Sequence, residues 1–323
     1  MKLGIIAITS GGRKLAQRIA AVLPNSLVLE NQGKIAETFA RHWHDLDGFV
    51  CVMAAGIAVR AIAPLLESKQ TDPCVVVLDE SGHHVISLLS GHLGGGNGLA
   101  TEVAELLGAT PVITTASDTL GLPALDLWAR EQQLLVEDKE ALTAVSARLV
   151  NRGSLKIFAE QAVGHMPPAL HPVTDPAEAD VIVSAKVMNK SSAVFFRPPT
   201  LVVGVGCNRG TPASEFEVAL AELFEQEGLS PLSIRNLASI DAKDDEEGLL
   251  AFAKRHGWRI DFYNKEEINN VGNVAVSPAA LKAVGAKGVA EPAALLSAQN
   301  KELLVGKRKW QNVTMAVARV SST

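Results

Sequence analysis

The run VISLLSGHLGGGNGLATEVAELLG at residues 85–108 decides the fold class of the N-terminal part of the chain. Residues 85–89 are apolar enough for a buried strand, and residues 90–98 form a glycine-rich loop. The apolar spacing of residues 99–107 predicts a helix, which ends at Gly108. A strand, a glycine loop and a helix in this order form the repeating unit of an α/β layered domain.

Further units of the same kind lie on both sides of this run. In the N-terminal part we expect strands at residues 3–8, 49–53, 74–78 and 111–113, and helices at residues 15–23 and 54–66. The turn sequence Asp79-Glu80-Ser81-Gly82 predicts a hairpin between residues 74–78 and 85–89. Residues 1–128 therefore form an N-terminal α/β domain.

A second α/β unit begins after Pro198 and Pro199, which forbid a continuing strand or helix. Its strands are expected at residues 201–205, 258–262, 303–305 and 313–318, and its helices at 213–228, 249–256 and 281–284. The sequence therefore predicts two α/β domains with mostly parallel sheets, at residues 1–128 and 200–323. Residues 129–199, with four prolines between 167 and 176, form a less regular middle segment that joins them.

Composition excludes several classes of function. The 323 residues carry a net charge of −5, which disfavours nucleic acid as a partner, and no apolar run approaches the roughly 18 residues of a membrane span. The three cysteines, Cys51, Cys74 and Cys207, lie far apart and favour a reducing cytoplasm over a disulfide framework. His83 and His84 point to opposite faces of a strand, so we expect no protein metal site.

The glycine-rich loop is the first candidate site. Ser90, Gly91, Gly94, Gly95, Gly96 and Asn97 surround His92, a side chain that titrates near neutral pH. Glycines let a ligand approach the backbone, and amides at a helix N-terminus attract anions. The spacing fits neither a dinucleotide fingerprint nor a Walker loop. A structural alternative is a loop in which Asn97 caps the helix.

Two more candidate sites follow strands. Gly206, Cys207, Asn208 and Arg209 precede a predicted helix, whose N-terminus is expected to lower the pKa of the Cys207 thiol. The alternative is a tight turn around a packed thiol. Thr114, Thr115 and Asp118 follow the strand at 111–113 and suit substrate orientation or proton transfer, with a helix cap as the alternative.

In combination and order, these motifs resemble the cobalt-precorrin-5A hydrolase family of anaerobic cobalamin biosynthesis. The resemblance rests on GIAVR (56–60), LLSGHLGG (88–95) and PVITTASD (111–118) in the first domain. It continues with GVGCNRGT (204–211), ASIDAK (238–243) and GVAEPAAL (288–295) in the second. The family commonly has Ala at the position of Gly96 and Thr at the position of Ser117. The resemblance covers nearly the whole chain and is weakest across residues 130–200.

The resemblance implies a reaction and a substrate. Water opens a δ-lactone on a ring-contracted cobalt tetrapyrrole, and the extruded carbon leaves as acetaldehyde. His92 is the best candidate for the base, Asp118 is a second proton acceptor, and the amides of residues 94–96 can stabilise an oxyanion. Arg60, Arg209 and Lys307 are candidate clamps for the substrate's carboxylates.

Cobalt enters with the substrate, so no cofactor is expected, and neighbouring pathway enzymes are candidate partners. Two other functions stay open. One is a carrier of corrinoid intermediates that performs no chemistry, which an assay for acetaldehyde would distinguish from a hydrolase. The other is an unrelated nucleotide-binding α/β enzyme, which the missing dinucleotide and Walker spacings disfavour.

Overall fold

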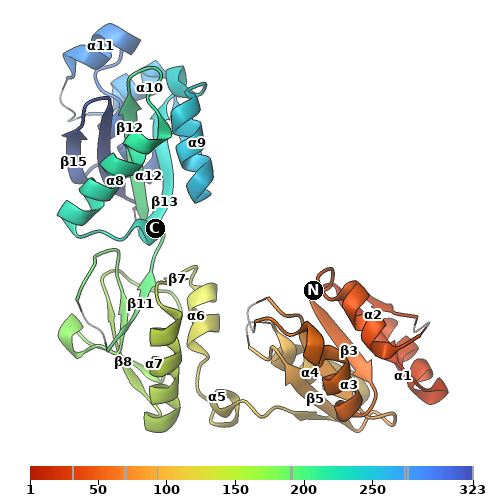
Figure 1. Ribbon diagram of the computed structural model, residues 1–323. Coiled ribbons are helices and arrows are strands. Elements are labelled where there is room, and N and C mark those ends of the chain that lie inside the picture. Colours follow the sequence, from red (N-terminus) through yellow and green to blue (C-terminus); the bar gives the residue numbers. More distant parts are fainter. Residues whose placement is uncertain are drawn as a thin grey trace. The chain divides into compact units, whose positions relative to one another are not determined.

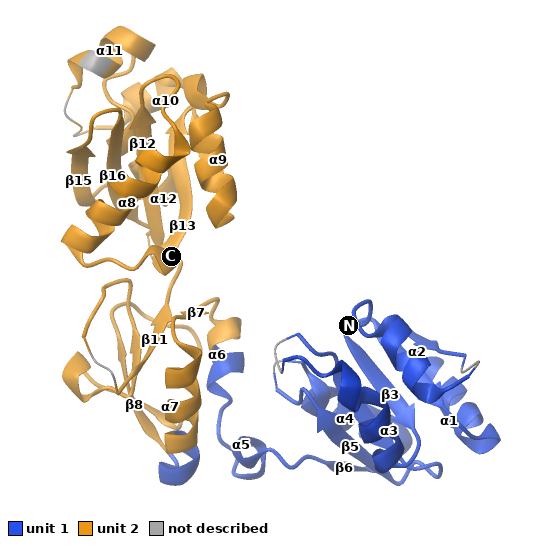
Figure 2. Cartoon of the chain, in the orientation of Figure 1, with its two compact units in different colours: residues 1–128, 149–153 blue, residues 129–148, 154–323 orange. Residues whose placement is uncertain are grey.

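The computed structural model describes residues 1–30, 33–68, 71–92, 94–189, 192–272, 274 and 276–321. Leu93 of the glycine loop lies outside the described residues. The chain divides into two compact units, residues 1–128 with 149–153 and residues 129–148 with 154–323 (Figure 2). Each of three sheets takes its strands from one stretch of the chain (Figure 1), which confirms the α/β class. The first two sheets are mostly parallel, whereas the third has two parallel and two antiparallel pairs.

The N-terminal sheet has the strand order β2-β1-β3-β4-β5-β6. Its strands are β1 (Leu3–Ala7), β2 (Ser26–Val28), β3 (Gly48–Val52), β4 (Cys74–Leu78), β5 (His84–Leu89) and β6 (Thr110–Val112). The helices of this part are α1 (Ser10–Ala20), α2 (Ile35–His42), α3 (Ala55–Ile62), α4 (Gly96–Leu107) and α5 (Ala116–Thr119).

Helices cover both faces of this sheet because its strands are apolar on both sides. Ile19 of α1 and Val103 of α4 pack on one face, in a cluster with Ile5. Phe39 of α2 and Ala58 of α3 belong to the cluster on the other face. Strands buried on both faces are typical of a parallel, doubly wound sheet.

The direction of β5 determines where the glycine loop lies. Strands β1 to β4 are parallel, whereas β5 pairs antiparallel with β4, as the turn sequence predicted, and β6 runs parallel to β5. The carboxyl ends of β5 and β6 therefore lie at the edge where β1, β3 and β4 begin. In agreement with this placement, the Ser90 hydroxyl donates to the Asp72 carbonyl, just before β4, over 3.0 Å.

The middle segment differs from the expectation of irregular chain, because it builds a five-stranded sheet of order β7-β11-β10-β8-β9. Its elements are α6 (Leu125–Glu131), β7 (Leu135–Val136), α7 (Lys139–Arg152), β8 (Leu155–Ala159), β9 (Leu170–Pro172), β10 (Val181–Val183) and β11 (Val194–Arg197). These strands have two to five residues, so each gives only a weak signal in the sequence.

The C-terminal sheet has the order β14-β13-β12-β16-β15, in which β12, β13 and β14 are parallel. Its strands are β12 (Leu201–Cys207), β13 (Ile234–Ile240), β14 (Ile260–Tyr263), β15 (Leu303–Lys309) and β16 (Val313–Arg319). Its helices are α8 (Ala213–Glu227), α9 (Glu247–His256), α10 (Lys265–Asn270), α11 (Pro278–Val284) and α12 (Ala290–Ala298).

Helix α12 packs unusually close to this sheet. A Cβ atom built on Gly204 of β12 would lie 1.8 Å from the Ala290 carbonyl oxygen, so only glycine fits there. Helices α8 and α9 cover the opposite face through Phe216 and Phe252. The close approach of α12 fixes the backbone beside Gly206 and Cys207, where β12 ends.

Candidate functional site

His92 and Asp118, which follow different strands, are hydrogen-bonded. Their Nε2 and Oδ2 atoms are 2.7 Å apart, and the Ser117 hydroxyl lies 3.2 Å from the same nitrogen. The His92 side chain is 22% exposed and the Asp118 side chain 40%. Because Nε2 faces the carboxylate, it carries the proton in the neutral tautomer that pairs best with Asp118, which leaves Nδ1 as the basic nitrogen.

Asn97 connects the glycine loop to this pair. Its Nδ2 atom donates to Asp118 Oδ2 over 2.9 Å and to the Thr115 hydroxyl over 3.2 Å. Asn97 belongs to the first turn of α4, whose N-cap is Gly95, so Asn97 is not the cap that the structural alternative required. Thr115 occupies the N-cap position of α5 but makes no capping bond, and Thr114 is exposed beside it.

The loop backbone explains most of its glycines. Built Cβ atoms would lie 2.4 Å from Asn97 Oδ1 at Gly91 and 2.5 Å from Ser90 Cβ at Gly94, while Gly95 has a φ of +81°. The Gly95 and Gly96 amides donate to the His92 and Ser90 carbonyls over 2.9 and 3.1 Å. Those two amides are therefore already used and do not stabilise an oxyanion, contrary to expectation; the Gly94 amide stays a candidate.

Arg60 belongs to another part of the N-terminal sheet. It is exposed on α3, and its Nη1 atom lies 3.7 Å from a Cβ atom built on Gly56, in the first turn of that helix. Helix α3 begins after β3, at the carboxyl ends of β1, β3 and β4. The reversal of β5 puts His92 at the opposite edge, so the structure does not bring Arg60 to the His92–Asp118 pair.

The second candidate site is a cavity of about 580 Å³ in the C-terminal sheet region. It is lined by the predicted residues Gly206, Cys207, Asn208, Arg209 and Lys307. The Asn208 amide group donates to Asn312 Oδ1 over 2.9 Å, and its backbone N–H donates to the Asn312 carbonyl over the same distance. This double link holds the loop after β12 against the turn before β16.

The pKa of the Cys207 thiol is raised and not lowered as expected. Burial raises its pKa to about 11, and the nearby Glu246 carboxylate acts in the same direction. The Lys243 and Arg209 cations lower the pKa, but by less than burial raises it. The predicted lowering of the pKa by the helix N-terminus is therefore wrong, since desolvation outweighs it.

The cations of this cavity divide into engaged and available ones. Arg209 is 62% exposed, pairs with Asp245 and donates to the Ala242 carbonyl over 3.0 Å. Lys243 is buried and pairs with Glu246 over 3.2 Å. The side chains of Lys307 and Lys309 line the cavity without such an ion pair among the described residues.

Lys309 also lines the cavity, as do Trp310 and Asn312, which sequence reasoning did not single out. Strand alternation was the available signal: Lys307 and Lys309 line the cavity, whereas Arg308 pairs with Glu227 over 2.8 Å outside it.

Within the described ranges, no group of three or more His, Cys, Asp or Glu side chains is arranged to hold a metal ion. The same ranges contain no helix long and apolar enough to span a membrane.

Comparison with known proteins identifies the family of this chain. The model "Cobalamin synthesis G N-terminal" matches residues 37–118, and "Cobalamin synthesis G C-terminus" matches residues 201–318. The curated cobalt-precorrin-5A hydrolase of Priestia megaterium is 34% identical over 98% of this chain and 94% of its own length. The chain belongs to the cobalt-precorrin-5A hydrolase family.

A second relative of the cobalt-precorrin-5A hydrolase family, from Salmonella typhimurium, is 32% identical over 98% of this chain and 97% of its own length. A solved cobalamin biosynthesis protein G homolog from Sulfolobus solfataricus aligns with a TM-score of 0.40 and 23% identity, over 99% of this chain and 97% of that one. The two matched ranges contain the His92–Asp118 pair and the residues of the C-terminal cavity named above.

Proposed function

We propose that this chain is a cobalt-precorrin-5A hydrolase, which opens the δ-lactone of its cobalt tetrapyrrole with water and releases acetaldehyde to give cobalt-precorrin-5B. Family membership over nearly the full length supports the substrate. The bonded His92–Asp118 pair is the observation that supports hydrolytic chemistry, since it combines a basic nitrogen with a carboxylate that stabilises its protonated form.

The first step is the addition of water to the lactone carbonyl. Nδ1 of His92 takes a proton from the water, the new C–O bond forms, and the ring C–O bond breaks. The products are a carboxylate and an alcohol on the carbon that bears the methyl group. Asp118 holds the imidazole by Nε2 and stabilises the imidazolium, the role that a carboxylate has in a hydrolase triad.

The second step breaks a carbon–carbon bond. The alcohol loses its proton to His92 or Asp118, its C–O bond becomes the carbonyl of acetaldehyde, and the electron pair of the broken C–C bond stays on the macrocycle, where a proton is added. One base that alternates between accepting and donating protons serves both steps.

The C-terminal cavity is proposed to hold carboxylate side chains of the tetrapyrrole. Lys307 and Lys309 supply positive charge that makes no ion pair among the described residues. Arg209 can contribute only if it leaves Asp245. We expect Lys307→Ala to raise KM several-fold with little change in kcat, because uniform binding is lost.

Incubation of the purified chain with the lactone, followed by measurement of acetaldehyde, tests the proposal. A hydrolase releases acetaldehyde in proportion to the lactone consumed, and His92→Asn stops release while the corrinoid still binds. Tight binding of the lactone without acetaldehyde would refute the hydrolase and identify a carrier of intermediates.

A further inference from the structure

Two lysines of β15 supply the free positive charge of the C-terminal cavity of about 580 Å³. Lys307 and Lys309 both line the cavity and make no ion pair among the described residues. Arg209 and Lys243 line it too, but each already pairs with a carboxylate. The one acidic side chain in the described lining, Glu291, accepts from the backbone N–H of Lys307 over 3.0 Å.

A β-bulge sets the direction of the two lysine side chains. The register of β15 against β16 shifts between Val305 and Arg308, so that two residues of β15 lie opposite one residue of β16. In regular alternation Lys307 would lie on the same face as Val305, which is buried in the cluster covered by α8 and α9. The extra residue instead turns Arg308 toward α8, and Lys307 and Lys309 toward the cavity. Bulges often re-aim side chains next to functional sites.

Bonds to α8 hold this part of the hairpin in place. Three alternate residues donate to glutamates of α8: Arg308 to Glu227 over 2.8 Å, Trp310 to Glu222 over 2.7 Å and Asn312 to Glu215 over 3.0 Å. The strand that carries Lys307 and Lys309 therefore cannot rotate without breaking them. Residues two apart in a strand have Cα atoms about 6.6 Å from each other, so the two ammonium groups start from a fixed separation.

Another part of the lining is mostly apolar. Helix α11 contributes Ala280, Ala283 and Val284, and α12 contributes Pro292 beside Glu291. These apolar side chains can contact the carbon skeleton of a ligand whose acid groups reach the lysines. The cavity also has the volume of a typical small-molecule site.

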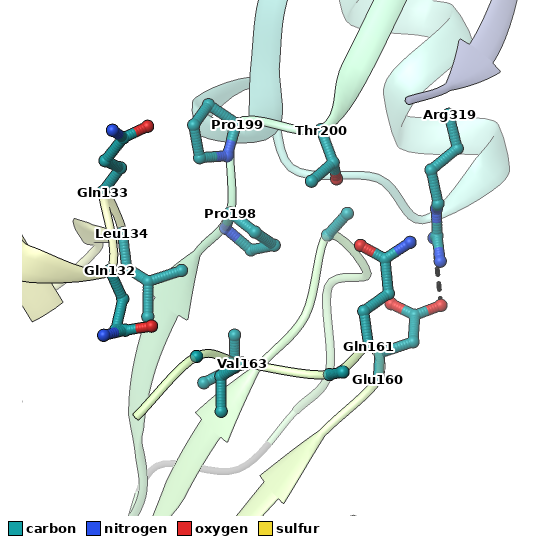
Figure 3. A pocket seen from close by; sticks show the side chains of 14 residues that line it. Gln132, Gln133, Leu134, Glu160, Gln161, Val163, Pro198, Pro199, Thr200 and Arg319 are labelled. Carbon is teal, nitrogen blue, oxygen red and sulfur yellow. Dashed lines mark hydrogen bonds and ion pairs between the residues drawn. The ribbon is translucent and has the colours of Figure 1, made fainter. Parts of the chain in front are cut away.

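The smaller cavity of the second unit differs in its charges. Figure 3 shows this cavity of about 240 Å³, in which Arg319 and Glu160 are bonded to each other over 3.0 Å. Gln132, Gln133 and Gln161 are among its other lining residues, and none of its further described lining residues is charged. A free pair of cations therefore distinguishes the larger cavity.

We propose that Lys307 and Lys309 bind two carboxylates of one molecule at the same time, one on each ammonium group. The ligand class is a dicarboxylate whose acid groups are separated by about five carbon atoms, with its carbon skeleton against the apolar lining. This separation matches an acetate and a propionate side chain on adjacent carbons of one pyrrole ring. Assignment of that ring to the cobalt tetrapyrrole rests on the proposed function, whereas the two-point contact itself does not.

Binding of sodium pimelate and sodium heptanoate to the full chain tests the two-point contact. The two compounds have carbon chains of equal length, but pimelate has a carboxylate at both ends and heptanoate at one. Ligand-observed NMR titrations measure the two Kd values at one low ionic strength, because salt screens exposed charges. We expect pimelate to bind about threefold to fivefold more tightly, which is the contribution of a second exposed ion pair.

Lys307→Gln and Lys309→Gln identify the contact. Each variant leaves one free ammonium group, so the ratio of the heptanoate Kd to the pimelate Kd should fall to about one. Lys301→Gln, at an exposed lysine just before β15, removes the same charge and should leave the ratio unchanged. A ratio near one in the parent, or a ratio that neither cavity variant lowers, would overturn the two-point site.

A spectroscopic titration with the lactone identifies the natural ligand. Saturating pimelate should raise the apparent Kd of the lactone in the parent, but not in the double variant of Lys307→Gln and Lys309→Gln. An unchanged Kd in the parent would overturn the assignment to the tetrapyrrole. A chain that prefers pimelate but binds no lactone would refute the proposed function and leave the two-point site intact. Because neither titration requires turnover, release of acetaldehyde tests the hydrolase separately.

Discussion

Replacing Asp118 by asparagine tests the role of the carboxylate beside His92. The change removes the negative charge that Nε2 faces at 2.7 Å but keeps the size and the contact with Asn97. Hydrogen bonds to charged groups contribute about 1.5–3 kcal/mol, and the 40% exposure of the Asp118 side chain favours the lower end through solvent screening. About 1.5 kcal/mol corresponds to a roughly tenfold slower kcat.

His92→Asn removes the base itself and should slow kcat about 10²–10⁴-fold, so that release of acetaldehyde nearly stops on the time scale of the parent assay. If Asp118 acts only through the imidazole, the two losses are not additive, and the double variant should be as slow as His92→Asn alone. Single-turnover release of acetaldehyde measures the chemical step, and a spectroscopic titration with the corrinoid measures affinity, which should change little. Asp45→Asn, at an exposed aspartate of the same unit, is the control for loss of one charge.

Three results would contradict this reasoning. If Asp118→Asn is as slow as His92→Asn, the carboxylate does more than stabilise the imidazolium: it is then either the base itself or the group that keeps the ring proton on Nε2. If the losses multiply in the double variant, the two residues act independently. If His92→Asn stays within threefold of the parent, neither residue of the pair supplies the base.

Three further changes test other features. Cys207→Ser should keep most activity, and a thioester trapped on Cys207 would contradict this prediction. Because burial raises the pKa of the Cys207 thiol to about 11, iodoacetamide should react slowly at pH 8 and faster toward pH 11. Gly204→Ala should lower the free energy of unfolding by several kcal/mol, since its Cβ would lie 1.8 Å from the Ala290 carbonyl oxygen. Gly98→Ala, with open space around it, should raise the free energy of unfolding by about 0.5–1 kcal/mol, and urea denaturation measures both. The bonds from Ser184 and Arg319 outweigh burial and hold the pKa of Glu160 below its usual 4.5, so this stabilisation is complete above that pH and is lost as pH falls through the lower, native value. Glu160→Gln should therefore flatten the acid limb of a stability–pH profile, and an unchanged limb would exclude this role.

Much of the fold could be predicted because its main strands are long apolar runs. β4 was predicted residue for residue, and β1, β3 and β12 to within one or two residues. β13 was missed because IRNLASI has neither a continuous apolar run nor strict alternation, although six of its seven residues are buried, Asn236 among them. Helix α12 was missed because it is apolar on all sides, so no helical periodicity marks it.

The site was predictable in its residue types but not in its arrangement. The loops at 90–98 and 114–118 were both recognised, yet their meeting through the His92–Asp118 bond depends on β6 pairing with β5, which is a tertiary fact. The pKa of Cys207 was predicted in the wrong direction because burial cannot be read from the position of a helix N-terminus. The placement of Arg60 failed for a different reason, since the antiparallel strand β5 puts His92 at the opposite edge of the sheet.

The reversed strand β5 also connects the chemistry to a distant turn. Its six residues span about 20 Å, from His84 to Leu89, next to Ser90. The register of β5 is set at the opposite end, where the Asp79 carboxylate accepts from the backbone N–H groups of Ser81, His83 and His84. Because strand side chains alternate, one residue inserted or deleted in that turn would rotate the far end of β5 by half a turn. The orientation of His92 is thus specified in part by a single aspartate at the opposite end of the strand.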